Sequence, residues 1–147
     1  MKIPSEESLL YGALENHFKK RGYHIINAHE IRIGVKSMDR ADLIAIGKDF
    51  SIIIIEVKMT AHKQLLNQLL KRLFYGDYVY AALPEGKART FMKKFMKLLK
   101  RYGVGVLSVE GEHVNELLKA NKSKHTLPYM KIKIVNKLLK RGKNIHE

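Results

Sequence analysis

The stretch Ser51-Ile52-Ile53-Ile54-Ile55-Glu56-Val57-Lys58 decides the fold that this sequence predicts. Consecutive β-branched apolar residues are typical of a strand that is buried on both faces, as in the centre of a sheet. Side chains alternate along a strand, so Glu56 and Lys58 are expected on one face, side by side at the strand's end. The stretch therefore predicts a central strand that ends in an acid and an amine.

A second strand is predicted over residues 41–47, and Lys48-Asp49 reads as a tight turn between the two strands. In such a hairpin Asp42 lies across from Glu56 or Lys58. Two carboxylates and an ammonium group then converge at one sheet edge, which suits metal-assisted hydrolysis of a phosphodiester. Oxygen ligands hold Mg²⁺ with several waters left on it, and a nearby lysine stabilises negative charge on phosphate. The alternative is a strand end whose charges simply face water.

Helical and strand periodicity predict further elements on both sides of this hairpin. Helices are expected over residues 5–21, 61–74, 88–102, 113–120 and 130–140, and strands over residues 23–33, 77–83 and 104–109. The element order through residue 83 is αβββαβ. The fold class is therefore α/β, with a mixed central sheet flanked by helices.

The order αβββαβ, together with Asp42 and the Glu56-Val57-Lys58 triplet, resembles the PD-(D/E)xK nuclease superfamily, which has the restriction-endonuclease-like fold. Ala41 stands where the superfamily motif usually has proline. The resemblance covers about residues 5–84, and within the superfamily it is greatest to small archaeal Holliday junction resolvase-type nucleases. It implies a nuclease-like domain over residues 1–120 and leaves residues 121–147 as a basic C-terminal extension, with 121–124 as a linker.

The resemblance also implies roles for individual residues. Asp42 and Glu56 would bind Mg²⁺, or Mn²⁺ in its place, and the backbone carbonyl of Val57 would add a ligand. Lys58 would position or activate the attacking water. Glu7, which also suits the first turn of a helix, would hold a second metal or a metal-bound water. A glutamine in the following helix would orient Lys58 or a phosphate, and Gln68 is preferred over Gln64 one turn earlier.

The charge of the chain predicts an anionic partner. The 147 residues include 28 Lys and Arg against 14 Asp and Glu, a net charge of +14, and the excess is concentrated after residue 87. Nucleic acid is the usual partner of so basic a domain. A plain solvated surface or a hot habitat is the alternative explanation. Residues expected to contact DNA are Ser37, Arg40, Lys93, Lys94, Lys97, Lys131, Lys133, Lys137, Lys140 and Arg141.

Composition narrows the remaining possibilities. Apolar residues make up 46% of the chain, which suffices for a packed core, and the absence of cysteine excludes disulfides and thiolate metal sites. Neither a signal peptide nor a membrane-spanning run is visible, so a cytoplasmic, nucleoid-associated protein is expected. The apolar side of residues 127–139 is a candidate contact with a second subunit, and a homodimer would suit a four-way junction or a palindromic site.

These observations predict a Mg²⁺-dependent DNA endonuclease, with structure selectivity of the Holliday junction resolvase type as the narrower expectation. A nuclease-fold protein that binds DNA without cutting it is the alternative. A basic scaffold or interaction domain is a third interpretation, which absence of DNA binding at low salt would favour.

Overall fold

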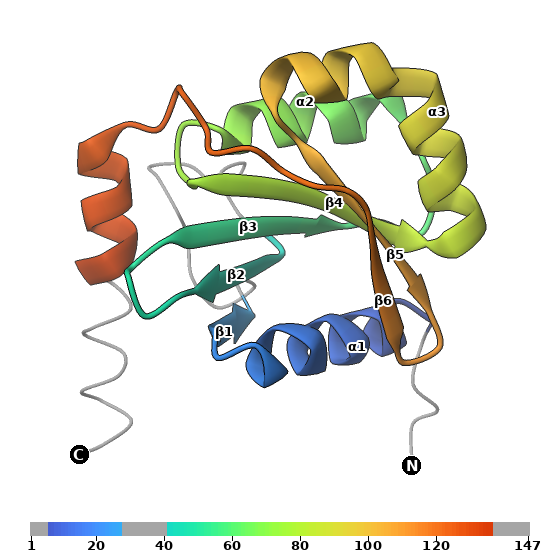
Figure 1. The fold of residues 1–147 in the computed structure, drawn as a ribbon, viewed down its shortest axis with the longest axis horizontal. Coiled ribbons are helices and arrows are strands. Elements are labelled where there is room, and N and C mark those ends of the chain that lie inside the picture. The colour runs from blue at the N-terminus through green and yellow to red at the C-terminus, as the bar shows by residue number, and fades with distance from the viewer. Residues whose placement is uncertain (1–5, 28–40, 137–147) are drawn as a thin grey trace.

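The computed structural model describes residues 6–27 and 41–136, and its elements follow one another in the order shown in Figure 1. They are α1 (Glu6–Lys20), β1 (His24–Asn27), β2 (Leu43–Ile46), β3 (Ile52–Val57), α2 (Lys63–Arg72), β4 (Tyr78–Pro84), α3 (Glu85–Tyr102), β5 (Gly105–Glu110) and β6 (His113–Leu118). Residues 128–136 form a further helix near the C-terminus.

The strands form a single mixed sheet of six strands in the order β1-β2-β3-β4-β5-β6. β1, β2 and β3 pair antiparallel, β3, β4 and β5 pair parallel, and β6 returns antiparallel to β5. Helices α2 and α3 make the crossovers that the two parallel pairings require. The predicted α/β class and the αβββαβ order are confirmed.

The residues of β3 divide the core between the two faces of the sheet. Ile52 and Ile54 belong to the cluster that α2, α3 and residues 128–136 cover, whereas Ile53, Ile55 and Val57 belong to the cluster that α1 covers. In Figure 1, α1 lies below the sheet and α2 and α3 lie above it. β3 is buried along its whole length because both faces are covered.

Residues 113–120, predicted to form a helix, instead contain strand β6, so that prediction is wrong. Gly111 adopts a left-handed φ of 59°, which closes a tight hairpin from β5 to β6. The backbone of β6 then pairs with β5 from Val106 to Glu110, with one register shift. The Tyr80 hydroxyl donates to Glu116 on this strand at 2.8 Å. Pairing with a neighbouring strand overrode a weak helical pattern.

The segment predicted to be a linker is hydrogen-bonded to the body of the protein. Asn121 donates its backbone N–H to Gly103 O at 2.9 Å, and Ser123 donates its backbone N–H to Asp77 O. The Ser123 hydroxyl also donates to Leu73 O at 2.7 Å. Residues 121–125 therefore lie against the end of α3 and the turn between α2 and β4.

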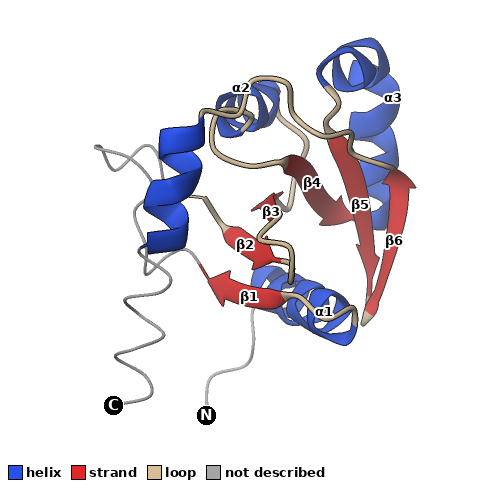
Figure 2. Cartoon of the chain, turned by 60° about the vertical axis from the view of Figure 1, so that its left-hand side comes forward, coloured by secondary structure: helices blue, strands red, loops and turns tan. Residues whose placement is uncertain are grey.

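The helix at residues 128–136 packs on the same core as α2. Ile134 is buried in that core, and Met130 and Val135 pack beside it. The described part of the apolar side expected to meet a second subunit is thus covered by the chain itself. Figure 2 shows this helix beside the sheet, at the end near β1 and β2.

No helix among the described residues is long and apolar enough to cross a membrane. The predicted strand beyond Asn27, and five of the residues expected to contact DNA, lie outside the described residues. The latter are Ser37, Arg40, Lys137, Lys140 and Arg141.

Candidate active site

The β2–β3 hairpin brings Asp42 and Glu56 together. Leu43 pairs with Ile55, so the next position along this antiparallel register sets Asp42 directly across from Glu56. Asp42 Oδ2 accepts a hydrogen bond from the backbone N–H of Val57 at 2.8 Å. The sequence had left Glu56 and Lys58 as alternative partners of Asp42, and the register selects Glu56.

Glu56 is a buried acid with partners on two sides. Its side chain is 2% exposed, and Oε1 accepts a hydrogen bond from Nε of Arg72 on α2 at 2.5 Å. A hydrogen bond also joins it to Asp42. Burial and the Asp42 charge raise the pKa of Glu56 to about 8, against the lowering effect of Arg72. Burial beside Asp42 therefore favours the protonated form of Glu56, and the Arg72 guanidinium opposes that preference.

Helix α1 closes the site through Tyr11. Its hydroxyl hydrogen-bonds to Asp42, and burial together with the charges of Asp42, Glu7 and Glu56 raises the pKa of Tyr11. Glu7 lies one turn before Tyr11 and is exposed, so it borders the site from the solvent side. The N-terminal half of α1 thus approaches the sheet at the end where β2 begins.

The remaining residues predicted to act in catalysis come from the end of β3 and from α2. Lys58, just beyond β3, is half-buried, and its backbone N–H donates to Ala82 O at 3.0 Å. Gln68 lies one turn before Arg72 on α2, and its Oε1 is buried without a hydrogen-bond partner in the described part of the chain. Gln64 is exposed. Of the two glutamines, Gln68 is therefore the one whose amide oxygen is buried. Gln68 and Arg72 are four residues apart, so they lie on the same side of α2.

Two residues of this network, Arg72 and Tyr11, were not predicted from the sequence. Arg72 follows Gln68 by four positions, and Tyr11 follows Glu7 by four. Residues spaced in this way lie on one face of a helix. Extending each predicted helical face by one turn would have found both residues.

The residues present fit a hard divalent cation. Mg²⁺ in proteins is usually held by one or two carboxylates and keeps several waters. Asp42 and Glu56 supply two adjacent carboxylates, and the negative charge of Asp42 disfavours the anionic form of Glu56. A bound cation would offset this repulsion between the two carboxylates. No group of three or more Asp, Glu, His or Cys with metal-binding spacing occurs in residues 6–27 and 41–136. Glu7 therefore lies near the pair without joining it in one ligand cluster.

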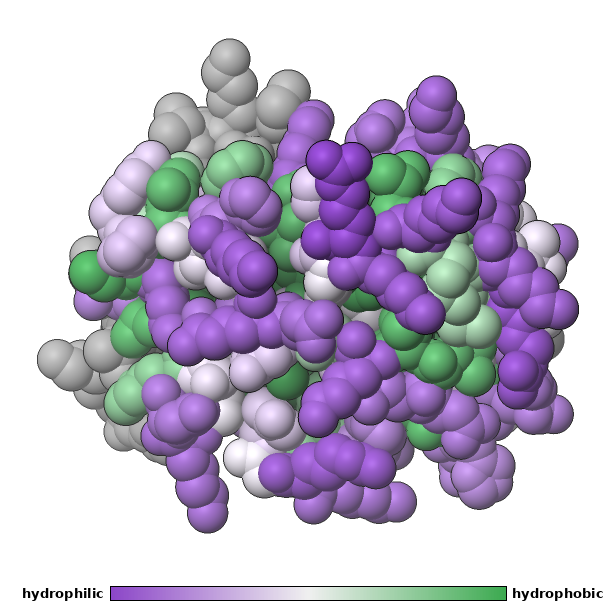
Figure 3. Space-filling view, turned by 45° about the horizontal axis from the view of Figure 1, so that its top comes forward, coloured by the Kyte–Doolittle hydropathy of each residue, from purple (hydrophilic) through white to green (hydrophobic). Residues whose placement is uncertain are grey.

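The lysines that are expected to contact DNA differ in their exposure and in their contacts within the chain. Lys93, Lys94 and Lys97 are exposed on α3, and Lys133 is exposed near the C-terminus. Lys131 instead places its Nζ 2.8 Å from Oδ2 of the buried Asp77. The face made by α2 and α3 is covered mainly by hydrophilic side chains, with hydrophobic patches between them (Figure 3). The ammonium group of Lys131 is paired with a buried carboxylate, whereas that of Lys94 lies over the Phe95 ring, 5.5 Å from its centroid.

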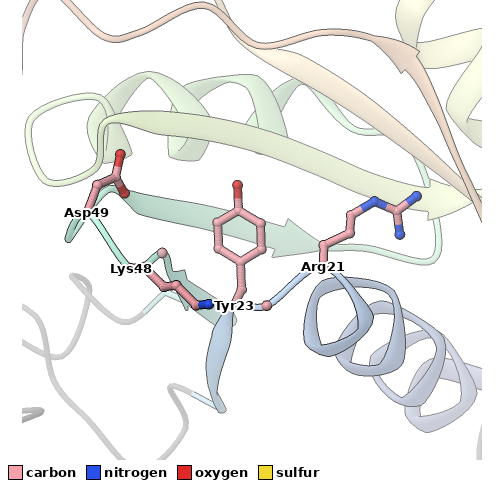
Figure 4. A pocket seen from close by; sticks show the side chains of 6 residues that line it. Arg21, Tyr23, Lys48 and Asp49 are labelled. Atoms are coloured by element: carbon pink, nitrogen blue, oxygen red, sulfur yellow. The ribbon is translucent and has the colours of Figure 1, made fainter.

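A surface pocket of about 340 Å³ lies at the opposite end of β2 from Asp42. Tyr23 stands between Arg21 and the Lys48–Asp49 turn in Figure 4. Asp49 is bonded within its own turn, since its carboxylate accepts from the Ser51 hydroxyl at 2.8 Å. None of the predicted catalytic residues is among the described residues that line this pocket, so it is separate from the carboxylate pair.

Of the comparisons with known proteins, only the one with solved structures found matches. No protein-family model and no curated protein matches the chain. Among solved structures it is similar to the SPO1766 protein of unknown function from Silicibacter pomeroyi, with a TM-score of 0.70 and 16% identity over 97% of this chain and 90% of that one.

Two further solved structures have lower TM-scores. A repair endonuclease from Pyrococcus abyssi has a TM-score of 0.48 and 17% identity, over 76% of this chain and 50% of that one. The structure of an EndoMS-dsDNA2 complex has a TM-score of 0.46 and 18% identity, over 75% of this chain and 48% of that one. The chain spans about half the length of these two proteins. The likeness to the SPO1766 protein shows the fold alone.

Proposed function

We propose that this protein is a metal-dependent DNA endonuclease of the PD-(D/E)xK type, which hydrolyses phosphodiester bonds. The observation that carries the proposal is the pairing of Asp42 and Glu56 across β2 and β3, with Lys58 two residues beyond Glu56. A binding surface for an anionic polymer has no need of two adjacent carboxylates. Hydrolysis of a phosphodiester uses two carboxylates and an amine, and Lys58 follows Glu56 by two residues.

Asp42 and Glu56 would hold Mg²⁺ or Mn²⁺, with the Val57 carbonyl as a further ligand. Glu7 would hold a second metal or a metal-bound water. Such an ion neutralises a phosphate and lowers the pKa of a water bound to it. Lys58 orients the attacking water and stabilises negative charge on the phosphate. Gln68 would orient Lys58 or a phosphate from α2.

Two residues are assigned positioning roles. Arg72 fixes the Glu56 carboxylate through the bond from its Nε, and Tyr11 fixes Asp42 through its hydroxyl. Their partners are thereby held in one orientation before any ligand arrives. Preorganised ligands bind a metal more tightly and in fewer geometries than mobile ones.

Cleavage of labelled DNA tests the proposal directly. The panel contains single strand, duplex, flap and four-way junction, each incubated with Mg²⁺, Mn²⁺ or EDTA. We expect metal-dependent products from the unmodified chain and a loss of more than about a hundredfold in Asp42→Asn and Glu56→Gln, because each removes a ligand charge. Glu112→Gln, at an exposed acid in the β5–β6 turn, is the matched control. Full activity in either site variant would falsify the proposal.

Selectivity for the four-way junction and a homodimeric state are the narrower parts of the proposal. Symmetric cleavage of a junction requires two sites related by a two-fold axis. Paired nicks in the junction alone support this part, and broad cutting of the panel contradicts it. Sedimentation of the protein with and without junction DNA tests the dimer independently, since a monomer in both conditions excludes it.

A second candidate function is DNA binding without cleavage. The buried Arg72–Glu56 ion pair favours it, because the arginine already compensates the charge that a metal would otherwise neutralise. This candidate predicts salt-sensitive DNA binding that Glu56→Gln leaves unchanged, with no product in any metal. The same panel therefore separates the two functions.

A further inference from the structure

Basic side chains from two distant segments surround a pocket of about 140 Å³ at the C-terminal end of α3. Lys100 and Arg101 come from the last turn of α3, and Lys122, Lys124 and His125 come from the segment after β6. We refer to this as the cationic pocket. A water takes up about 30 Å³ of liquid volume, so the pocket has room for a tetrahedral oxyanion together with water.

The walls of the cationic pocket are held in place by the backbone. Gly103 ends α3 in a left-handed conformation with φ of 72°, and its carbonyl accepts from the N–H of Asn121 at 2.9 Å. A Cβ atom at Gly103 would lie 3.1 Å from Asn121 Cβ, so this approach is close. Ser123 Oγ accepts from the N–H of His125 at 3.1 Å. The segment that carries Lys122 and Lys124 is therefore fixed before any ligand binds.

No acidic residue of the described chain lines the cationic pocket. Four basic side chains consequently lie near one another without a carboxylate among the described lining residues, and each repels the others. An anion that enters the pocket is attracted by all four basic side chains at once. The buried acids elsewhere in the described chain are already bound, Glu56 by Arg72 and Asp77 by Lys131.

The cationic pocket continues the basic face of α3. Lys97 and Lys100 are three residues apart in the part of α3 that follows a kink at Phe95, which places them on one side of that part, and Lys93 lies before the kink. Lys93, Lys97 and Lys100 are all exposed. An extended polyanion can therefore contact α3 through several phosphates and reach the pocket at its end.

We propose that the cationic pocket binds a phosphate group of a nucleic-acid strand that lies along α3. The assignment rests on the convergence of Lys100, Arg101, Lys122 and Lys124, on the fixed backbone beneath them and on the exposed lysines of α3 that precede them. It goes beyond the proposed endonuclease, because none of these residues belongs to the carboxylate site. Phosphate contacts position a strand and carry no sequence information.

Binding in EDTA tests this assignment without any cleavage. The probe is a fluorescein-labelled single-stranded oligonucleotide, measured by anisotropy over a range of salt concentrations. The variant is the full chain with Lys122→Gln and Lys124→Gln. Its matched control is Lys19→Gln with Lys20→Gln, which lowers the net charge equally at two exposed residues of α1.

We expect about a tenfold loss of affinity in the pocket variant and little loss in the control, since a bound phosphate loses two direct contacts only in the former. The plot of log affinity against log salt should also become less steep in the pocket variant, by about 1.4 for two lost contacts on a single strand. Equal losses in both variants would overturn the proposal and leave only the overall positive field.

A second arm distinguishes the source of the phosphate. Inorganic phosphate and pyrophosphate are titrated by calorimetry into the unmodified chain and into the pocket variant. If only the free anions lose affinity in the variant, while the oligonucleotide binds with unchanged affinity, the nucleic-acid assignment is overturned. Cleavage is measured separately, so failure here leaves the endonuclease proposal intact.

Discussion

The carboxylate site contains buried acids that have partners within the chain, whereas the cationic pocket contains exposed basic side chains. At the carboxylate site Asp42 and Glu56 are packed between the sheet, α1 and α2, and each has a specific partner within the chain. In the cationic pocket, four exposed cations lie together with no acid among the described lining residues. The charges of the carboxylate site have partners within the fold. In the cationic pocket the end of α3 and the Tyr102 ring offset part of the charge of Lys100 and Arg101, and no acid among the described lining residues offsets the rest.

Because of this difference, we expect the carboxylate site to affect the stability of the fold and the cationic pocket to affect ligand binding. A buried charge must keep its partner because water cannot replace it, so the partners of Glu56 are part of what holds the fold. An exposed lysine is solvated with or without a ligand, so the pocket adds little to folding. Substitutions in the two regions should therefore differ sharply in their effect on the free energy of unfolding.

The largest effect is expected from Arg72→Met. Removing the guanidinium leaves the buried Glu56 carboxyl without its basic partner, which costs about 3–5 kcal/mol of unfolding free energy. Denaturant unfolding at neutral pH measures this loss. Arg89→Met is the matched control, because Arg89 pairs with Glu85 at the surface and should unfold like the unmodified chain. Equal stability of the two variants would show that the buried pair is not needed by the fold.

The second effect is a fall in stability with rising pH. The raised pKa of Glu56, about 8 against an ordinary value of 4.5, means that the folded chain keeps a proton that the unfolded chain has lost between these values. The contribution of Glu56 to the free energy of unfolding is therefore fully present below its unfolded pKa and is lost as pH rises toward its folded pKa. Each pH unit in that window is worth up to about 1.4 kcal/mol.

Unfolding free energies at pH 5, 6 and 7 without divalent metal measure this dependence. Glu56→Gln cannot titrate, so its stability should change less over the same window. A parallel pH dependence in both proteins would assign the effect to another group.

A third and smaller effect concerns how the cationic pocket is supported. Ile134 is 1% exposed and fixes the helix that follows the segment bearing Lys122 and Lys124. Ile134→Val removes one buried methylene and should cost about 0.5–1.5 kcal/mol. Ile132, 57% exposed on the same helix, supplies the control Ile132→Val. If both changes have the same effect on the unfolding midpoint, this helix does not belong to the cooperative core.

The smallest effect on stability is expected from Lys122→Gln with Lys124→Gln. Both lysines are exposed, so unfolding should be unchanged within error or slightly improved by reduced repulsion. The same variant is expected to lose nucleic-acid binding, and the carboxylate variants to keep it. A clear loss of stability here would contradict the contrast between the two regions.

The β2–β3 hairpin at the centre of the fold could be predicted because it depends on residues that are close together in the sequence. The run Ile52–Ile55 and the Lys48–Asp49 turn fix two adjacent strands, and their short connection leaves few registers. The sequence pattern therefore suffices to place Asp42 close to Glu56. The choice of Gln68 over Gln64, and the roles of Lys58 and Glu7, remain predictions.

Other features could not be obtained in this way. Residues 113–118 have little periodicity of their own, and they form β6 because the open edge of β5 offers its backbone groups a partner. The basic extension looked separate because of its charge, yet Ile134 is buried in the main core. In both cases the deciding contacts join residues far apart in the chain.

The sequence by itself determined the αβββαβ order, the buried central strand, the facing carboxylates and the excess of positive charge. These depend on residue periodicity, on a short turn and on composition, all of which act over a few residues. Tertiary structure alone decided that Arg72 and Tyr11 would complete the carboxylate site and that Lys100 and Lys122 would share a pocket. Such partners are set by how helices pack on the sheet, and packing depends on the whole core at once.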